Sequence, residues 1–144
     1  MAKHYNQGVF QPKNPSKYIG TFPITYRSAW ELTFMNLCDK HPNIVQWASE
    51  SLKIPYQHPL TGRPAAYIPD FLIIYIDKNG QRHGELVEIK PRNQAVKEAA
   101  KGGHNKREYV VNQAKWAAAD AWCKKHGLTF RVVTEQELYR GAKR

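Results

Sequence analysis

Residues 66–90 decide the fold of this 144-residue chain, and they read AYIPDFLIIYIDKNGQRHGELVEIK. Two β-rich segments, Ala66–Asp77 and Gln81–Lys90, are separated only by Lys78-Asn79-Gly80. An Asn-Gly step between two apolar runs is typical of a tight hairpin turn, because both residues tolerate a positive φ. The segment therefore predicts two antiparallel strands joined by a short loop.

The length of this loop determines which residues face each other across the hairpin. A three-residue loop with Gly80 in the left-handed conformation pairs Asp77 with Gln81, and it places Asp70 opposite Glu88. A two-residue loop would move the pairing by one residue and separate the two acids onto opposite faces of the sheet. The sequence leaves both registers open.

Both faces of the predicted hairpin are apolar. Alternate residues of a strand point to opposite faces of a sheet. One face carries Leu72, Ile74, Ile76 and Leu86, and the other carries Phe71, Ile73, Tyr75, Val87 and Ile89. A sheet of this kind needs helices on both faces to bury it.

Helices that could cover the sheet are predicted before and after the hairpin. Ser28 followed three residues later by Glu31 forms a capping box, which predicts a helix over Ala29–Lys40. The longest helix candidate is Lys106–Lys125, and Gly127 stops it. Its apolar stripe is predicted to contain Val111, Ala114, Ala118 and Ala121.

Shorter segments complete an order of α-β-β-β-α-β-α. They are the extended segments Ile44–Glu50 and Ser51–Tyr56, a short helix or ordered loop over Arg92–Lys101, a strand over Thr129–Val133 and a final helix from Thr134. We expect residues 1–24 to form an extended basic arm and residues 25–144 to form a single domain. The expected fold class is α/β, with a mixed β-sheet flanked by helices on both faces.

The composition favours a protein that binds a polyanion. The chain has 22 Lys and Arg against 12 Asp and Glu, so its formal net charge is +10, and its pI is about 9.7. Nucleic acid is the commonest polyanion that proteins with such a positive charge bind. A generic basic surface is the alternative that charge by itself leaves open.

Several classes of protein are excluded by the sequence. No apolar run approaches the roughly 20 residues that span a bilayer, and the first residues lack the apolar core of a secretory signal. Cys38 and Cys123 lack a CxxC spacing and are expected to be free thiols. We therefore expect a cytoplasmic protein with no membrane partner.

Three polar residues meet at one end of the predicted hairpin. Glu88 and Lys90 share a face because they are two residues apart, and the three-residue loop adds Asp70. Two carboxylates suit a hard divalent cation such as Mg²⁺ or Mn²⁺, which can activate a water molecule for attack on a phosphate. A neighbouring ammonium can orient or deprotonate that water. The alternative is a solvated strand face with a surface ion pair.

This arrangement resembles the PD-(D/E)xK nuclease superfamily, in which the motif lies on such a hairpin. The matching residues are Pro69-Asp70 and Glu88-Ile89-Lys90. Members often carry an acid on the preceding helix, which is Glu31 here, and a polar residue on the helix after the second strand, which is Gln113 here. The resemblance implies a single-domain restriction-endonuclease-like core.

Within that superfamily the chain looks most like the TnsA-type endonucleases and the head-completion nuclease proteins of tailed phages. The likeness covers roughly residues 20–135 and includes Tyr67-Ile68-Pro69-Asp70-Phe71 and Val87-Glu88-Ile89-Lys90-Pro91. The phage proteins are the better match in size. One departure from the TnsA pattern is Glu88, since a Gln precedes the lysine motif there.

The resemblance implies a DNA endonuclease that depends on Mg²⁺ or Mn²⁺. The implied catalytic residues are Glu31, Asp70, Glu88, Lys90 and Gln113. The implied metal ligands are Asp70, Glu88, the carbonyl of Ile89 and Glu31. The residues expected to bind nucleic acid are Lys106, Arg107 and Lys115.

The resemblance also implies a biological setting. A phage protein of this kind would act on packaged DNA in the host cytoplasm and the virion, with DNA and phage portal or head proteins as partners. The alternative function is a structural head-completion or DNA-end-binding protein without relevant cleavage, and a basic binding module without a metal site is a third. Glu31 also has a purely local alternative, since the capping box assigns it to the helix end.

Overall fold

The computed structural model describes residues 7–90 and 103–134 of the chain. Its centre is a four-stranded sheet with the strand order β3-β6-β7-β8. The strands are β3 (Ile44–Ser49), β6 (Phe71–Ile76), β7 (Arg82–Ile89) and β8 (Thr129–Val133). Strand β3 pairs with β6 and β6 with β7 antiparallel, whereas β7 pairs with β8 parallel, so the predicted mixed sheet is confirmed.

The hairpin has the register that places the two acids together. Phe71 pairs with Val87 and Tyr75 with His83. The N–H of Asp77 donates to the carbonyl of Gln81 at 2.9 Å, and Gly80 has a φ of 79°. The three-residue loop is therefore confirmed, because its left-handed position falls on the glycine that tolerates it.

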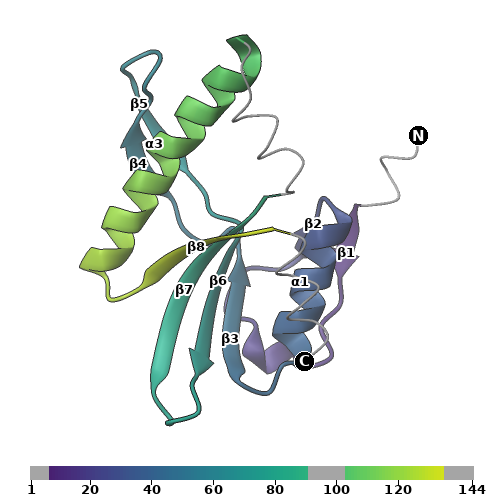
Figure 1. Cartoon of the computed structure of the whole chain (residues 1–144). Coiled ribbons are helices and arrows are strands. Elements are labelled where there is room, and N and C mark those ends of the chain that lie inside the picture. Colours follow the sequence, from purple (N-terminus) through teal and green to yellow (C-terminus); the bar gives the residue numbers. More distant parts are fainter. Residues whose placement is uncertain (1–6, 91–102, 135–144) are drawn as a thin grey trace.

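One face of the sheet is covered by α1 (Ala29–Lys40) (Figure 1). The helix begins where the capping box predicted, since the N–H of Glu31 donates to Oγ of Ser28 at 3.1 Å. Its inward side packs against the strands in a single apolar cluster. That cluster includes Phe34, Met35 and Cys38 of the helix and Trp47, Phe71, Ile73, Val87 and Ile89 of the sheet.

The other face is covered by α3 (Gly103–Lys125), which confirms that helices flank both faces (Figure 1). Ala119 and Cys123 are fully buried and pack against Leu86. The predicted apolar stripe was wrong in part, because Ala121 is exposed and Ala119 lies at the centre of the contact. Alanines occur all round this helix, so their spacing could not single out the packed face.

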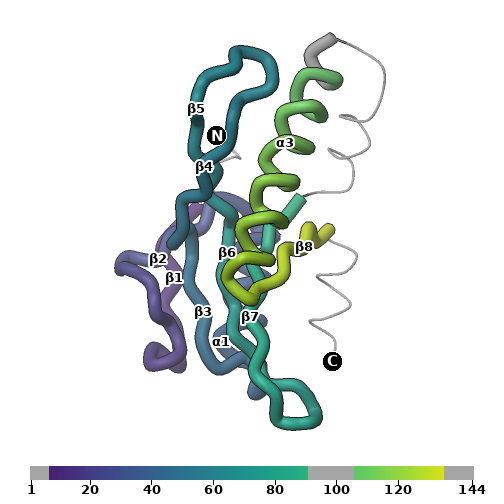
Figure 2. Tube along the Cα trace, turned by 90° about the vertical axis from the view of Figure 1, so that its left-hand side faces the viewer, coloured from purple at the N-terminus to yellow at the C-terminus, as the bar shows by residue number. Residues whose placement is uncertain are grey.

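The segment Ala66–Asp77 is not one continuous strand, and this corrects the sequence prediction. Its first residues belong to β5 (Pro64–Tyr67), which pairs with β4 (Ile54–Gln57) in a separate two-stranded sheet. Strand β6 starts only at Phe71. Pro69 lies between the two strands, and its missing N–H cannot contribute to a ladder of hydrogen bonds. The β4–β5 hairpin runs beside α3 in both views (Figures 1 and 2).

The N-terminal segment packs on the α1 side of the sheet. Within residues 1–24, expected to be an extended basic arm, the described part contains β1 (Gly8–Phe10) and the 3-10 helix η2 (Pro15–Lys17). Strand β1 pairs antiparallel with β2 (Ile24–Tyr26), and Phe10 and Tyr18 are buried in the α1 cluster. The division of the chain into an arm and a domain stays a prediction.

Asp39 ties this N-terminal segment to α1. Its side chain is 1% exposed and accepts hydrogen bonds from the backbone N–H groups of Lys13 and Asn14, at 2.9 and 3.0 Å. Nζ of Lys17 also donates to the carbonyl of Asp39 at 3.0 Å. Asp39 is thus a buried acid with a structural role in the fold.

Replacing Asp39 by alanine should lower the free energy of unfolding by about 2–3 kcal/mol, because two backbone donors lose their buried acceptor. Urea unfolding followed by Trp fluorescence measures the change. The control is Asp120→Ala, since the Asp120 side chain is 50% exposed and forms a surface ion pair with Lys124 at 3.1 Å. An Asp39→Ala protein as stable as this control would contradict the assignment.

Two predicted segments lie outside the described residues, namely Arg92–Lys101 and the final helix after Thr134. Within the described ranges, neither helix has the length and apolar character needed to cross a membrane. Cys38 and Cys123 are free thiols, as expected, and each is buried on a different face of the sheet.

Candidate active site at the end of the β6–β7 hairpin

The predicted acids meet where β6 begins and β7 ends. Asp70 directly precedes β6, Glu88 is the penultimate residue of β7, and Lys90 directly follows that strand. Leu86 and Leu72 pack toward α3, so the alternation of the strands places Glu88 and Asp70 on the α3 side. The backbone N–H of Lys90 donates to the carbonyl of Val133 at 2.9 Å, which fixes this residue to β8.

Asp70 is held by backbone groups of both neighbouring strands. Its Oδ2 accepts a hydrogen bond from the N–H of Ile89 at 2.8 Å. The carbonyl of Asp70 accepts from the N–H of Glu50 at 2.9 Å, which ties the start of β6 to the end of β3. This carboxylate is therefore oriented by β7 while its backbone is fixed by β3.

The Glu88 carboxylate is held from the β4–β5 hairpin. The hydroxyl of Tyr67, the last residue of β5, donates to Oε1 of Glu88 at 2.6 Å. Nζ of Lys115, on α3, lies 5.9 Å from the centroid of the Tyr67 ring. Both Lys115 and Lys90 lie near enough to Glu88 to lower the pKa of that carboxyl, although burial raises this pKa more.

Both acids are half-buried, and Glu88 destabilises the charged form of Asp70. Burial, followed by the charge of Glu88, raises the pKa of Asp70 to about 8. Glu31 and Glu50 contribute smaller increases to the pKa of Asp70. Burial and the charge of Glu88 also raise the pKa of the Tyr67 hydroxyl, which keeps it a donor at neutral pH. The site thus gathers acidic groups at one end of the sheet, where their charged forms are disfavoured.

Glu31 fulfils its local role and also lies near the site. Its backbone N–H binds Ser28, and its Oε1 accepts from the backbone N–H of Arg27 at 3.0 Å, which completes the capping box. Burial is the main reason that its pKa is raised. Because its charge acts on Asp70 as well, the helix end brings a third acid to the same region.

The predicted residues on α3 differ in their position. Lys115 is half-buried above Tyr67, whereas Lys106, Arg107 and Gln113 are exposed. Within the described ranges, no hydrogen bond or ion pair joins Gln113 to the two carboxylates. The role of Gln113 in the site, and contacts of the three basic residues with nucleic acid, stay predictions.

Two residues near the acids, Tyr67 and Glu50, were not predicted as site residues from the sequence. Tyr67 comes from a strand that pairs with β4, and no local pattern connects it to Glu88. Glu50 directly follows β3 and has a φ of 48°, a left-handed conformation that is uncommon outside glycine, and its Oε2 accepts from Arg27 at 2.8 Å. Both reach the site through pairing between distant segments of the chain, which the sequence pattern does not encode.

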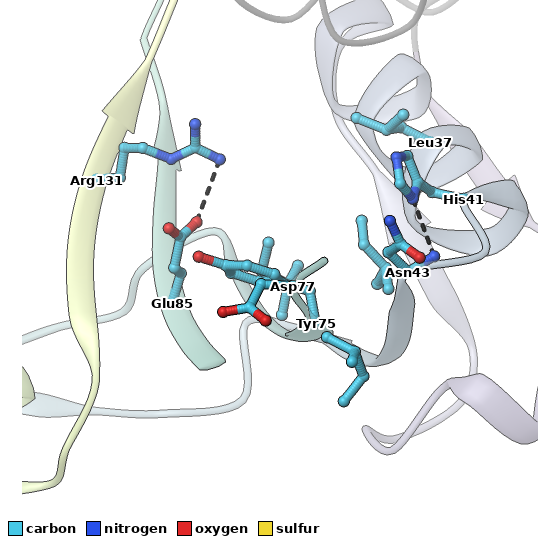
Figure 3. Close-up of a pocket in the computed structure, with 10 residues that line it drawn as sticks. Leu37, His41, Asn43, Tyr75, Asp77, Glu85 and Arg131 are labelled. Atoms are coloured by element: carbon cyan, nitrogen blue, oxygen red, sulfur yellow. Dashed lines mark hydrogen bonds and ion pairs between the residues drawn. The ribbon is translucent and has the colours of Figure 1, made fainter. Parts of the chain in front are cut away.

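A cavity of about 420 Å³ lies elsewhere, between α1 and the turn end of the β6–β7 hairpin (Figure 3). Arg131 and Glu85 form an ion pair at 3.2 Å on one side of it, and His41 lies on the other (Figure 3). Glu85 thus faces away from Glu88, as the alternation of side chains along a strand requires for residues three apart. Of the described residues that line this cavity, none is Asp70, Glu88 or Lys90.

Comparison with known proteins places this chain in a family. Residues 41–135 match the family described as the TnsA-like endonuclease N-terminal domain. The chain belongs to the TnsA-like endonuclease family. The matched range contains Asp70, Glu88 and Lys90, and the restriction-endonuclease-like fold that the resemblance implied agrees with the mixed α/β structure.

A relative of this TnsA-like chain comes from Enterobacteria phage T4. It is a protein named head completion nuclease, and it is 38% identical over 142 residues. The alignment covers 91% of this chain and 92% of the phage T4 protein. Because about a tenth of this chain lies outside the alignment, the similarity extends over β2 and α1 as well as most of the family domain.

Proposed function

We propose that this protein is a divalent-metal-dependent DNA endonuclease that acts in phage head completion. The observation that carries the proposal is the pair of half-buried carboxylates, Asp70 and Glu88, at the end of the β6–β7 hairpin with Lys90 beside them. Membership of the TnsA-like endonuclease family supports the reaction. The name of the phage T4 relative supports the setting.

The chemistry of the donor set fits a hard cation. Asp70 and Glu88 are half-buried side by side, and burial raises the pKa of each, so a positive partner between them would favour their charged forms. Mg²⁺ and Mn²⁺ prefer carboxylate oxygens and keep part of their water shell. Within the described residues, no group of three or more His, Cys, Asp or Glu has the geometry of a metal site. The proposed site therefore needs a backbone carbonyl and water to complete it.

Asp70, Glu88 and the carbonyl of Ile89 would hold the cation, with Glu31 near enough to assist. When bound, the cation would polarise the phosphate and lower the pKa of a water molecule bound to it. The N–H of Ile89 binds one carboxylate oxygen of Asp70, and the hydroxyl of Tyr67 binds one carboxylate oxygen of Glu88. These bonds set the direction in which the second oxygen of each carboxylate points. Lys90 would take or hold a proton of the attacking water, or stabilise charge on the phosphate.

The substrate is proposed to be DNA because the charge of the protein favours a polyanion. The net charge is +10, and Lys106, Arg107 and Lys115 are placed along α3, the helix that covers the acid-bearing face. Lysine and arginine contacts to phosphate give affinity without sequence preference. Packaged DNA in the virion, or in the host cytoplasm before assembly ends, is the proposed substrate, and portal or head proteins are the proposed protein partners.

Removing divalent cations tests the proposal directly. Purified protein should nick supercoiled plasmid in Mg²⁺ or Mn²⁺, and EDTA should reduce the nicking to background, because the water and phosphate then lack their activating charge. The measurement is the initial rate of conversion to open-circular DNA on an agarose gel. Returning Mg²⁺ in excess of EDTA should restore the rate.

Two outcomes would change the proposed function. Nicking that survives EDTA would contradict metal dependence. DNA binding in Mg²⁺ and Mn²⁺ without any nicking would favour the alternative function, a head-completion or DNA-end-binding protein without relevant cleavage.

A further inference from the structure

Tyr67 occupies an unusual place between the β4–β5 hairpin and the two acids. It is 5% exposed, and three elements fix its ring. Its strand pairs with Ile54 of β4, Lys115 of α3 lies over one face, and the ring of Phe130 on β8 packs edge-on at 6.3 Å. With its backbone paired to β4 and its ring in contact with α3 and β8, Tyr67 can direct its hydroxyl at one position.

That hydroxyl is aimed at Glu88. The O–H donates to Oε1 at 2.6 Å, a length typical of a hydrogen bond to a charged carboxylate. Asp70 has a comparable bond from the N–H of Ile89, which belongs to the rigid strand β7. The Ile89 N–H thus helps to orient one acid of the pair, and the other acid, Glu88, is held both by the backbone at Asp70 and by the Tyr67 side chain from a different sheet.

We propose that Tyr67 is a positioning residue, whose hydroxyl holds the Glu88 carboxylate in the orientation that a divalent cation requires. The inference rests on the proposed function and adds to it a residue that neither the sequence motif nor the family assigns. Groups that hydrogen-bond to a metal-binding side chain fix its orientation, and their loss typically costs about 10–100-fold in metal affinity or activity. The β4–β5 hairpin is thereby part of the active site.

The variant that tests this is Tyr67→Phe. Phenylalanine keeps the ring beneath Lys115 and against Phe130, so the fold should be retained. The matched control is Tyr56→Phe, which removes the same hydroxyl from β4 of the same hairpin, at a position that pairs with Ala65. Circular dichroism and thermal unfolding in EDTA confirm that both variants fold.

Metal binding is the first readout. Titration calorimetry with Mn²⁺ on wild-type protein, Tyr67→Phe and Tyr56→Phe should give a Kd about tenfold higher for Tyr67→Phe and an unchanged Kd for the control. The Mg²⁺ concentration needed for half-maximal nicking should rise by a similar factor. Nicking in Mn²⁺ should fall less than nicking in Mg²⁺, because Mg²⁺ demands a more regular geometry.

A double-mutant cycle shows whether Tyr67 acts through Glu88. In a Glu88→Gln protein, adding Tyr67→Phe should change the Mn²⁺ Kd by less than twofold, because the carboxylate to be oriented is already gone. A purely structural hydroxyl would lower the unfolding temperature and leave the Mn²⁺ Kd of Tyr67→Phe equal to that of the wild type. That result would overturn the inference.

The same experiments separate this inference from the proposed function. A wild-type protein that neither binds Mn²⁺ nor nicks DNA would contradict the metal-dependent nuclease itself. A wild-type protein that does both, beside a Tyr67→Phe protein with identical metal binding and Mg²⁺ dependence, would contradict only the role of Tyr67.

Discussion

A Lys90→Ala protein should nick DNA about 10²–10⁴-fold more slowly than the wild type and should bind DNA equally well. Lys90 follows β7 directly, and its backbone is fixed to β8 through Val133. Its ammonium lies near enough to Glu88 to lower the pKa of that carboxyl. The substitution thus removes a positive charge and a proton-transfer group beside the proposed metal ligands, while the remaining basic residues still hold the DNA.

The measurement is a nicking rate at saturating Mg²⁺, with DNA affinity determined by fluorescence anisotropy in Ca²⁺. Lys124→Ala is the control, because the Lys124 side chain is 76% exposed on α3 and forms a surface ion pair with Asp120. This control should nick at the wild-type rate. Equal nicking by Lys90→Ala and Lys124→Ala would place the chemistry elsewhere.

A Lys90→Arg protein distinguishes the two roles open to Lys90. Arginine retains the positive charge but does not give up its proton, since its pKa exceeds about 12. Substantial nicking by Lys90→Arg would show that charge stabilisation is enough. A rate as low as that of Lys90→Ala would indicate either that Lys90 transfers a proton or that the charge must lie where the lysine ammonium places it.

The hairpin that carries the acids could be predicted from sequence because its signals are local. Asn79-Gly80 sets the turn, and Gly80 adopts the positive φ that this loop requires. Ser28 and Glu31 set the start of α1 for the same reason, since both partners of the capping box lie within one helical turn. Once the register was fixed, the proximity of Asp70 to Glu88 followed from strand geometry.

The rest of the site depends on contacts between segments far apart in the chain. Tyr67 and Glu88 are 21 residues apart and lie in different sheets, so no periodicity connects them. Glu50 reaches the site through the pairing of β3 with β6, where Ser49 faces Phe71. The break between β5 and β6 also escaped prediction, because Tyr67 pairs with β4 and the apolar run continues past it.

Replacing Asp70 by asparagine should abolish nicking and, in EDTA at pH 8 or above, make the protein more stable. The Asp70 carboxyl is half-buried beside Glu88, and its burial and the charge of Glu88 raise its pKa to about 8 from an ordinary value of 3.8. Its charged form therefore destabilises the folded protein. Asparagine carries no charge, and its Oδ1 can still accept the hydrogen bond from the N–H of Ile89.

The direction of the pH dependence follows from this raised pKa. The folded protein binds the Asp70 proton more tightly than the unfolded chain, so the stabilisation from the protonated acid is complete below pH 3.8. It is lost as the pH rises through about 8. Asp70→Asn should therefore match the wild type near pH 4 and exceed it at pH 8 and above, by about 1–3 kcal/mol in the free energy of unfolding.

Divalent cations should reverse the order of stability of the wild type and Asp70→Asn. The negative charge of Asp70 that destabilises the folded protein is also the charge that binds the metal. With Mg²⁺ or Mn²⁺ at pH 8, the unfolding temperature of the wild type should rise with metal concentration, whereas that of Asp70→Asn should stay constant. Asp120→Asn is the matched control, since its exposed carboxylate should change neither value. A wild-type protein that is more stable than Asp70→Asn in EDTA, with no further rise in Mg²⁺ or Mn²⁺, would contradict a metal site at these acids.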